Sequence, residues 1–128
     1  MRLLLDTHAL IWWLAGDAAL SRAADAAIAD PGNDIFVSAV TAFEISNKFR
    51  LGKLPEAALL ANDFVAQVAA EGFSPLPISL AHGVRAGGLL FSHRDPFDRL
   101  LIAQALTEAM TLVSNERLFD ETAVPRLW

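Results

Sequence analysis

The sequence predicts an α/β fold in which helices cover both faces of a mostly parallel sheet. Short apolar segments alternate with segments of helical spacing along the whole chain. These apolar segments are typical of strands buried on both faces, which right-handed helical crossovers connect. With 128 residues, 54% of them hydrophobic and 20% charged, the chain can bury one core, so we expect a single domain over residues 1–128.

An apolar run and two helix signals predict the first three elements. Residues Arg2 to Leu5 are an apolar run that stops at Asp6, which predicts a strand. Residues 7–15 continue at helical spacing, and we expect a helix there. Ser21 is the expected N-cap of an alanine-rich helix over residues 22–29.

A buried strand and two longer helices should follow. Residues 34–37 form a short apolar run that is typical of a buried strand. Ser38 is the expected N-cap of the next helix, which should end near residue 51, before a glycine. A proline then favours the start of one continuous helix over residues 55–71, whose apolar stripe contains Leu60, Phe64 and Val68.

Prolines and glycines delimit the elements of the second half. Two prolines interrupt a strand over residues 73–78, which we place at the sheet edge because proline lacks a backbone donor. A helix should run from Ser79 to a glycine pair at 87–88. Asp95 as N-cap, followed by proline, should open a helix over residues 96–108. The remaining expected elements are a strand over 111–113, a helical turn over 116–119 and a strand over 123–127.

Composition and charge exclude several classes of protein. The longest apolar run, residues 9–15, is far shorter than the ~20 residues of a membrane helix, so we expect no membrane span. The chain has no cysteine, which excludes a disulfide scaffold and a thiolate zinc site and fits the cytoplasm. The formal net charge of -5 argues against binding nucleic acid through an overall basic surface.

Four acidic residues lie where an α/β fold assembles its functional site. Asp6 follows the first predicted strand, and Glu116 comes shortly after the strand over residues 111–113. Asp98 lies in the first turn of a predicted helix, and Glu44 is flanked by large apolar residues. Ligands of such folds bind at the carboxyl ends of the strands. These four acids are therefore our candidate site.

Each of the four acids also has a purely structural interpretation. Asp6 can cap the helix that follows it, and Asp98 can complete a capping box at the third helical position. Glu44 and Lys48 have the spacing of an ordinary ion pair on an exposed helix. Glu116 can be a surface acid on a turn. A single cluster accounts for all four residues, whereas the structural interpretations require four separate coincidences.

Clustered carboxylates would need a cation. Two carboxylates about 4 Å apart repel each other by roughly 4 kcal/mol at an effective dielectric constant of 20. Such a cluster therefore takes up protons or cations. Oxygen ligands select hard ions, so we expect Mg²⁺ or Mn²⁺.

Several motifs, in this order along the chain, resemble one known family. They are Leu3-Leu-Leu-Asp6-Thr-His8, Ser38-Ala-Val-Thr-Ala-Phe-Glu44-Ile, Leu51-Gly-Lys-Leu54, His93-Arg-Asp-Pro-Phe-Asp98-Arg-Leu-Leu-Ile-Ala-Gln104 and Leu112-Val-Ser-Asn-Glu116. The sequence resembles the PIN-domain ribonucleases and, more narrowly, the VapC toxins of bacterial toxin–antitoxin pairs, over nearly its whole length. This resemblance implies an α/β/α sandwich on a mostly parallel central sheet and metal-dependent endoribonuclease activity.

The resemblance also assigns the candidate site residues. Asp6, Glu44 and Asp98 fall on the family's most regular acidic ligand positions, whereas Glu116 stands where the family usually has aspartate. We expect these four acids to hold Mg²⁺ or Mn²⁺ and to hydrolyse RNA with a metal-activated water. Asn115 and Asp120 are nearby substitutes for the position of Glu116. Thr7 and Ser114 should orient a carboxylate or water, although Thr7 can equally belong to a helix cap.

Basic residues near Glu44 and Asp98 should contact the phosphates of a substrate. Six of the ten lysines and arginines flank these two acids in the sequence, and we expect them to form a phosphate-contacting rim. They are Lys48, Arg50, Lys53, Arg85, Arg94 and Arg99. We expect structural or surface roles for the three histidines, His8, His82 and His93.

The resemblance further implies protein partners. A small VapB-like antitoxin would place a helix in a groove near the helices that follow the second strand, and the chain would form a homodimer. The alternative is a catalytically impaired PIN-like module that binds RNA or protein, which the glutamate at position 116 leaves open. A phosphatase of the haloacid dehalogenase type is disfavoured because His8 stands where it needs aspartate, and a receiver domain because no lysine follows Lys53.

Overall fold

The chain folds around a five-stranded sheet in which every pair of neighbouring strands is parallel. This computed structural model describes residues 1–128, apart from the side chains at positions 56 and 59. The strands, in the sheet order β3-β2-β1-β4-β5, are β1 (Arg2–Leu5), β2 (Asp34–Ser38), β3 (Ser74–Leu76), β4 (Thr111–Val113) and β5 (Arg126–Leu127). The predicted parallel sheet is confirmed, and so is the edge position of the proline-containing strand β3.

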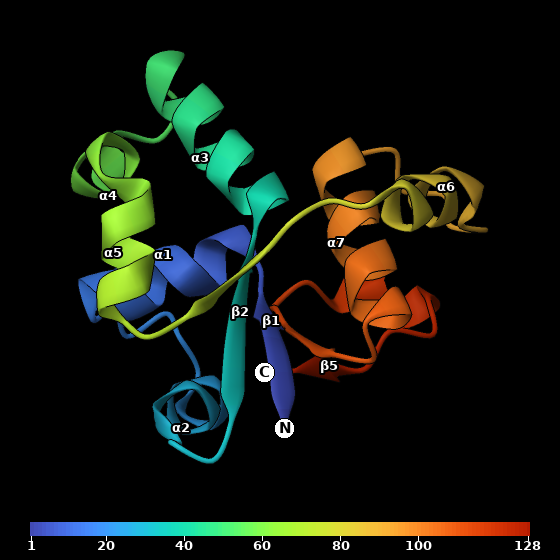
Figure 1. The fold of residues 1–128 in the computed structure, drawn as a ribbon, viewed down its shortest axis with the longest axis horizontal. Helices are drawn as coiled ribbons and strands as arrows, with labels where there is room; N and C mark the ends of the chain where they lie inside the picture. The colour runs from blue at the N-terminus through green and yellow to red at the C-terminus, as the bar shows by residue number, and fades with distance from the viewer.

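Helices cover both faces of this sheet (Figure 1). One face carries α1 (Thr7–Ala15), α2 (Arg22–Ala29), α4 (Ala58–Asn62) and α5 (Phe64–Ala70). The other face carries α7 (Pro96–Thr107), against which α6 (Leu80–Gly88) packs. α3 (Ala39–Arg50) follows β2 and contacts both α1 and α7, and the short 3₁₀ turns are η1 (Pro55–Ala57) and η2 (Arg117–Glu121). Within the residues that the structure describes, none of the helices has the length and apolarity that crossing a bilayer requires.

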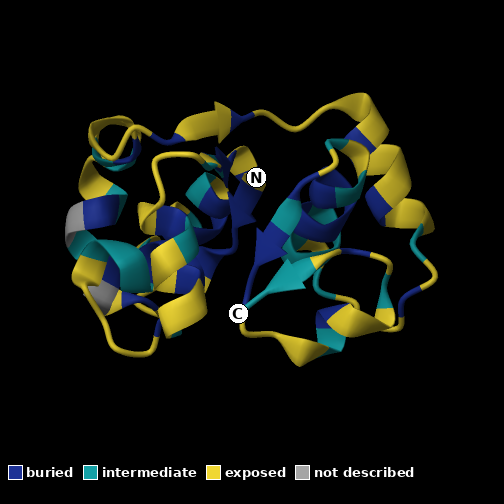
Figure 2. Ribbon diagram, turned by 90° about the horizontal axis from the view of Figure 1, so that it is seen from below, coloured by how far each residue is buried: buried dark blue, intermediate teal, exposed yellow. Residues whose placement is uncertain are grey.

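The central strand β1 supplies side chains to two apolar cores. Leu3 and Leu5 pack among α1, α2, α4 and α5, whereas Leu4 packs against α7. All three leucines are fully buried, since successive side chains of a strand point to opposite faces of the sheet. Figure 2 shows buried central strands and exposed outer helix faces. The uninterrupted leucine run is therefore a consequence of covering the sheet on both sides.

The predicted N-caps begin the helices as expected. Each cap side chain accepts a hydrogen bond from a backbone N–H of the first helical turn. The observed pairs are Ala24 to Ser21 at 3.1 Å, Val40 to Ser38 at 2.9 Å and Phe97 to Asp95 at 2.8 Å. Three short elements differ in extent from the prediction, because β3, η2 and β5 cover residues 74–76, 117–121 and 126–127.

The single helix predicted over residues 55–71 is wrong. The structure divides this segment into η1, α4 and α5, with a break at Asp63, whose backbone angles (φ -148°, ψ 48°) are not helical. Asn62 and Asp63 are both weak helix formers, so the break occurs where its cost is small. The division lets α4 pack against α3 while α5 packs against β3. Leu60 and Val68 are nevertheless buried in the same core, as their shared stripe predicts.

His82 has partners that the sequence did not reveal. Its side chain is almost fully buried, and its Nδ1 atom accepts a hydrogen bond from the Ser79 N–H at 2.9 Å. Its Nε2 atom faces the Glu108 carboxylate at 2.8 Å. The His82 N–H in turn donates to the Ser79 hydroxyl, so the two residues form a capping box at the start of α6.

The strand order changes direction at β1 and β4, so a binding crevice is expected at the carboxyl ends of these two strands. The chain passes from β1 to β2 and β3 on one side and later returns to β4 on the other side of β1. In open α/β sheets, a crevice forms at such a switch in strand order. Asp6 directly follows β1, and Ser114 directly follows β4.

Candidate functional site

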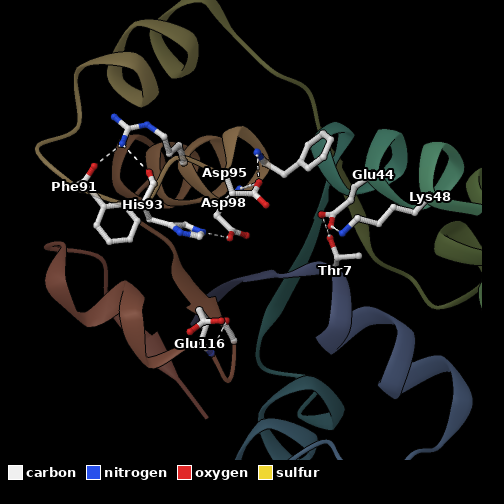
Figure 3. A network of polar contacts seen from close by, with 11 residues as sticks. Thr7, Glu44, Lys48, Phe91, His93, Asp95, Asp98 and Glu116 are labelled. Atoms are coloured by element: carbon white, nitrogen blue, oxygen red, sulfur yellow. Dashed lines mark hydrogen bonds and ion pairs between the residues drawn. The ribbon is translucent and has the colours of Figure 1, made fainter. Parts of the chain in front are cut away.

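A cavity of about 160 Å³ opens near the carboxyl ends of β1 and β4. All four predicted acids line it, although they come from distant parts of the sequence. Figure 3 shows Glu44, Asp98 and Glu116 on separate segments around a common space. The residues that line the cavity are Asp6, Thr7, His8, Glu44, Lys48, Asp95, Asp98, Asn115, Glu116 and Phe119.

Asp6 is both a helix cap and a buried wall of this cavity. One of its carboxylate oxygens accepts a hydrogen bond from the Ala9 N–H at 2.8 Å, which begins α1. Only 8% of the residue is exposed. Burial raises the pKa of Asp6, the Ser114 and Ala9 donors lower it, and the charge of Asp98 raises it. Asp6 and Asp98 line the same cavity.

Glu44 is buried and held at both carboxylate oxygens. The Thr7 hydroxyl donates a hydrogen bond to Oε1 at 2.7 Å, and the Lys48 ammonium forms an ion pair with Oε2. The i, i+4 pair that the sequence predicts is therefore present. Because Glu44 is only 7% exposed and lines the cavity, this pair does not lie on an open helix surface.

Asp98 and Asp95 lie together at the start of α7. Asp95 caps the helix through Oδ1, which accepts hydrogen bonds from the N–H groups of Phe97 at 2.8 Å and Asp98 at 3.3 Å. The Asp98 Oδ2 atom lies 2.7 Å from the His93 Nε2 atom. Burial raises the pKa of Asp98, the His93 hydrogen bond lowers it, and the charges of Asp95 and Glu44 raise it. The environment of Asp98 thus disfavours the negatively charged form of its carboxyl group when no cation is bound.

Glu116 and Ser114 reach the cavity from the segment after β4. Ser114 is fully buried, and its hydroxyl accepts a hydrogen bond from the Glu116 N–H at 3.0 Å. Glu116 is exposed and begins η2. Asn115, one of the two suggested substitutes, also lines the cavity. The other substitute, Asp120, is instead held by Arg126 through two hydrogen bonds of 2.8 Å.

Three of the six basic residues expected to contact phosphates lie in different settings in the structure. Lys48 lines the cavity. Arg50 is exposed and donates to the Asn47 side chain at 2.8 Å. Arg99 donates from Nε, Nη1 and Nη2 to backbone carbonyls between residues 86 and 93, which engages all five of its donors. Arg99 therefore anchors that segment, and its donors are occupied by backbone carbonyls rather than free to bind a phosphate.

Two further residues of the site were not among the predicted site residues. His93 was expected to have a structural or surface role, and Asp95 was expected to act as a cap. Together with Asp98 they offer ligand atoms within 4.8 Å of one another. Their close spacing in His93-Arg-Asp95-Pro-Phe-Asp98, at the start of a helix, is the signal that could have identified them.

The donor set fits a hard divalent cation. Five carboxylates and a single ammonium line the cavity among the residues whose side chains are described. Burial already raises the pKa values of two of these acids, Asp6 and Asp98. Taking up a cation relieves such an excess of negative charge, and carboxylate oxygens are the ligands that Mg²⁺ and Mn²⁺ accept. Asp6, Glu44, Asp95, Asp98 and Glu116 are the residues that could contribute oxygens.

Comparisons with known proteins identify the family. A chain of the VapBC2 structure from Rickettsia felis, solved with a DNA fragment from their promoter, is similar with a TM-score of 0.68 and 16% identity, covering 98% of this chain and 97% of that chain. A chain of a toxin–antitoxin complex from Klebsiella pneumoniae is similar with a TM-score of 0.55 and 20% identity, covering 89% and 86%. No curated protein matches the sequence. The family model of the PIN domain matches residues 3–125, so this chain belongs to the PIN domain family.

Proposed function

We propose that this protein is a metal-dependent endoribonuclease that hydrolyses RNA phosphodiester bonds with Mg²⁺ or Mn²⁺ as its cofactor. The observation that carries the proposal is the meeting of Asp6, Glu44, Asp98 and Glu116 in one cavity. PIN domain proteins are nucleases, and membership of that family supports the same chemistry. The direct ligands would be Asp6, Asp98 and Glu116, with Glu44 as a further ligand or as a base.

The cation would supply the electrophilic part of the chemistry. A divalent ion lowers the pKa of a water ligand and offsets negative charge on the scissile phosphate. Attack of water on the phosphorus would leave a 5′-phosphate and a 3′-hydroxyl, and it requires no 2′-hydroxyl. The excess of acids in the cavity explains why an acidic protein needs the cation before it can accept a phosphate.

The chain's own residues would orient the reacting groups. Thr7 and Lys48 hold Glu44 at both of its oxygens, which fixes the direction of this carboxylate. The contact with Glu44 uses one of the three donors of the Lys48 ammonium. The remaining donors of Lys48 can bind a phosphate oxygen of the substrate. Ala9 directs Asp6 in the same way, through the hydrogen bond that its backbone N–H donates.

RNA cleavage with and without metal tests this proposal. Purified protein, free of any partner, is incubated with a structured RNA in Mg²⁺, in Mn²⁺ or in EDTA. We expect cleavage in either metal, none in EDTA, and loss of at least about 100-fold in rate for Asp6→Asn, which keeps the helix cap but removes the charge. Asp120→Asn is the matched control, because this acid pairs with Arg126 and does not line the cavity.

The outcomes separate the candidate functions. Cleavage that persists in EDTA or in Asp6→Asn would contradict the nuclease proposal. RNA or protein binding without metal-dependent cleavage would favour the catalytically impaired binding module. The exposure of Glu116 is the observation on which that second candidate rests.

We also propose that the chain is the toxin of a toxin–antitoxin pair. The structural neighbours come from a VapBC2 structure and from a toxin–antitoxin complex, and this chain covers most of each. An apolar cavity of about 450 Å³ between α3, α5, β2 and β3 supports this proposal, because an apolar helix of the antitoxin would fit such a surface. Phe64, Val65 and Val68 are among the residues that line it, and Val65 is 83% exposed.

Co-purification tests this partner. The expected antitoxin is the product of a small reading frame next to the gene of this protein. Val65→Asp should weaken the complex at least about tenfold, because it places a charge in an apolar contact. Val84→Asp is the control, since Val84 is similarly exposed on α6 but does not line the cavity. Equal binding by both variants would exclude this surface. The homodimer stays a prediction that sedimentation can check.

A further inference from the structure

The His93 imidazole lies beside the carboxylates of Asp95 and Asp98, where it could bind the same cation. Its Nε2 atom lies 2.7 Å from Asp98 Oδ2, and Figure 3 shows the imidazole directed at that carboxylate. Ligand atoms of His93, Asp95 and Asp98 all lie within 4.8 Å of one another. Two atoms bound to one ion at about 2.1 Å each lie at most about 4.2 Å apart. A small inward movement would therefore bring all three residues onto the same cation.

The position of His93 is fixed by contacts outside the acidic cluster. The Arg99 Nη1 atom donates to the carbonyl oxygens of Phe91 at 2.8 Å and His93 at 3.1 Å. The Phe91 ring lies against the imidazole, with 5.6 Å between the ring centroids. Both the backbone and the ring of His93 are thus held before any ion binds. Such an arrangement reduces the conformational entropy that a ligand loses on binding.

We propose that His93 is a ligand of the cation at Asp98 and Asp95. The centre then combines an imidazole nitrogen with carboxylate oxygens and prefers Mn²⁺ and Co²⁺ to Mg²⁺. The physical reason is that imidazole adds affinity for transition metals, whereas Mg²⁺ prefers oxygen and holds its water ligands. This inference rests on the proposed function, because it concerns the same cation.

A purely supporting role for His93 makes a different prediction. If the imidazole only donates a hydrogen bond to Asp98, it orients a ligand and affects every ion to a similar extent. Replacing it would then weaken Mg²⁺ and Mn²⁺ alike. If the imidazole binds the ion directly, replacing it should weaken the binding of the transition metal selectively. A nitrogen atom of His93 is then bonded to the ion.

Pulsed electron paramagnetic resonance of bound Mn²⁺ distinguishes these roles. An imidazole nitrogen in direct contact with Mn²⁺ gives a ¹⁴N modulation, and we expect it in the wild-type protein. His93→Gln should remove this modulation, although glutamine keeps an N–H donor near the position of Nε2. His8→Gln is the matched control, because His8 lines the same cavity but packs against Trp12 at 5.4 Å between ring centroids.

Calorimetric titrations with Mn²⁺ and Mg²⁺ complete the experiment. His93→Gln should lose at least about tenfold in Mn²⁺ affinity and less than about threefold in Mg²⁺ affinity. His8→Gln should keep the wild-type preference. Equal losses for both ions, or a ¹⁴N modulation that survives in His93→Gln, would overturn the inference. Wild-type Mn²⁺ binding without ¹⁴N modulation would overturn it while leaving the proposed function intact, whereas no Mn²⁺ binding at all would overturn both.

Discussion

Asp98 lies half-buried between His93 and the other carboxylates of the cavity. Burial and the charges of Asp95 and Glu44 raise its pKa, whereas His93 lowers it. Without a cation, its negative charge is therefore a cost to the folded state. The same charge is what a cation would bind. The contributions of this side chain to stability and to activity should consequently have opposite signs.

Asp98→Asn should separate these two contributions. We expect RNA cleavage to fall at least about 100-fold, because a ligand charge is lost. The melting temperature in EDTA should be unchanged or higher, because repulsion within the cavity is relieved. Asparagine retains an oxygen that can accept the His93 hydrogen bond, so the local contacts are kept. A clear decrease in melting temperature would favour the helix-capping role of Asp98 instead.

The raised pKa values of Asp6 and Asp98 also predict a pH dependence of stability. Both carboxylates bind a proton in the folded protein at pH values where the unfolded chain has released it. The free energy of unfolding of the metal-free protein should therefore be highest near the ordinary pKa of 3.8 and fall as pH rises through the raised values. Asp120, whose pKa Arg126 lowers, acts in the opposite direction below 3.8.

Urea unfolding in EDTA between about pH 4 and pH 7 measures this dependence. The double variant Asp6→Asn, Asp98→Asn should lose most of the slope. Mg²⁺ or Mn²⁺ at 100 times its dissociation constant should raise the free energy of unfolding of the wild-type protein at pH 7 by about 2.7 kcal/mol. The same metal concentration should leave the free energy of unfolding of the double variant unchanged. An unaltered slope in the double variant would show that other groups produce it.

Individual residues were predictable where local rules determine their environment. Asp6 and Asp98 were identified because strand ends and helix starts bring ligands together in α/β folds. The actual partners of Arg99 were not predictable, because its donors bind carbonyls at the end of α6 and in the following loop, whose path depends on tertiary packing. The proximity of His93 to Asp98 was not predictable for a related reason, since it depends on that same loop.

Helix α7 begins at a residue that also belongs to the cavity. Asp95 caps the helix through Oδ1 and lines the cavity together with Asp98. Two substitutions separate these roles. Asp95→Ser keeps a capping oxygen but removes the carboxylate, whereas Asp95→Ala removes both.

We expect the two Asp95 variants to differ in stability and to agree in activity. Alanine should cost about 1 kcal/mol of unfolding free energy, and serine should cost much less. Both should reduce metal-dependent cleavage at least about tenfold. Chemical denaturation and an RNA cleavage assay measure the two quantities. Wild-type activity of Asp95→Ser would show that this aspartate serves the helix alone.

Most helices and strands could be predicted because helix-capping residues and prolines mark their ends. Ser21, Ser38 and Asp95 each cap the helix that follows. Pro75 in β3 and Pro77 just after it identify an edge strand. The division of residues 55–71 into three pieces was not predictable from a stripe of apolar residues. That division depends on α4 packing against α3 and on α5 packing against β3, which are tertiary contacts.

At the scale of the whole molecule, the sheet order explains the site. β1 lies between β2 and β4, so the residues that follow β1 and β4 meet at one edge of the sheet. α3 and α7 contact each other near this edge and contribute Glu44 and Asp98. The sequence could predict that these acids converge but not how each is held. The Thr7 and Lys48 contacts of Glu44, for example, depend on how α1 and α3 approach each other.

Anomalous diffraction from crystals of the wild-type protein soaked in Mn²⁺ would show whether the acidic cavity binds a cation. We expect a Mn²⁺ peak in the acidic cavity, about 2.2 Å from carboxylate oxygens of Asp6 and Asp98. The peak should be absent from crystals of Asp98→Asn soaked in the same way. Crystals with no Mn²⁺ in this cavity, or with Mn²⁺ bound only elsewhere on the molecule, would contradict the account.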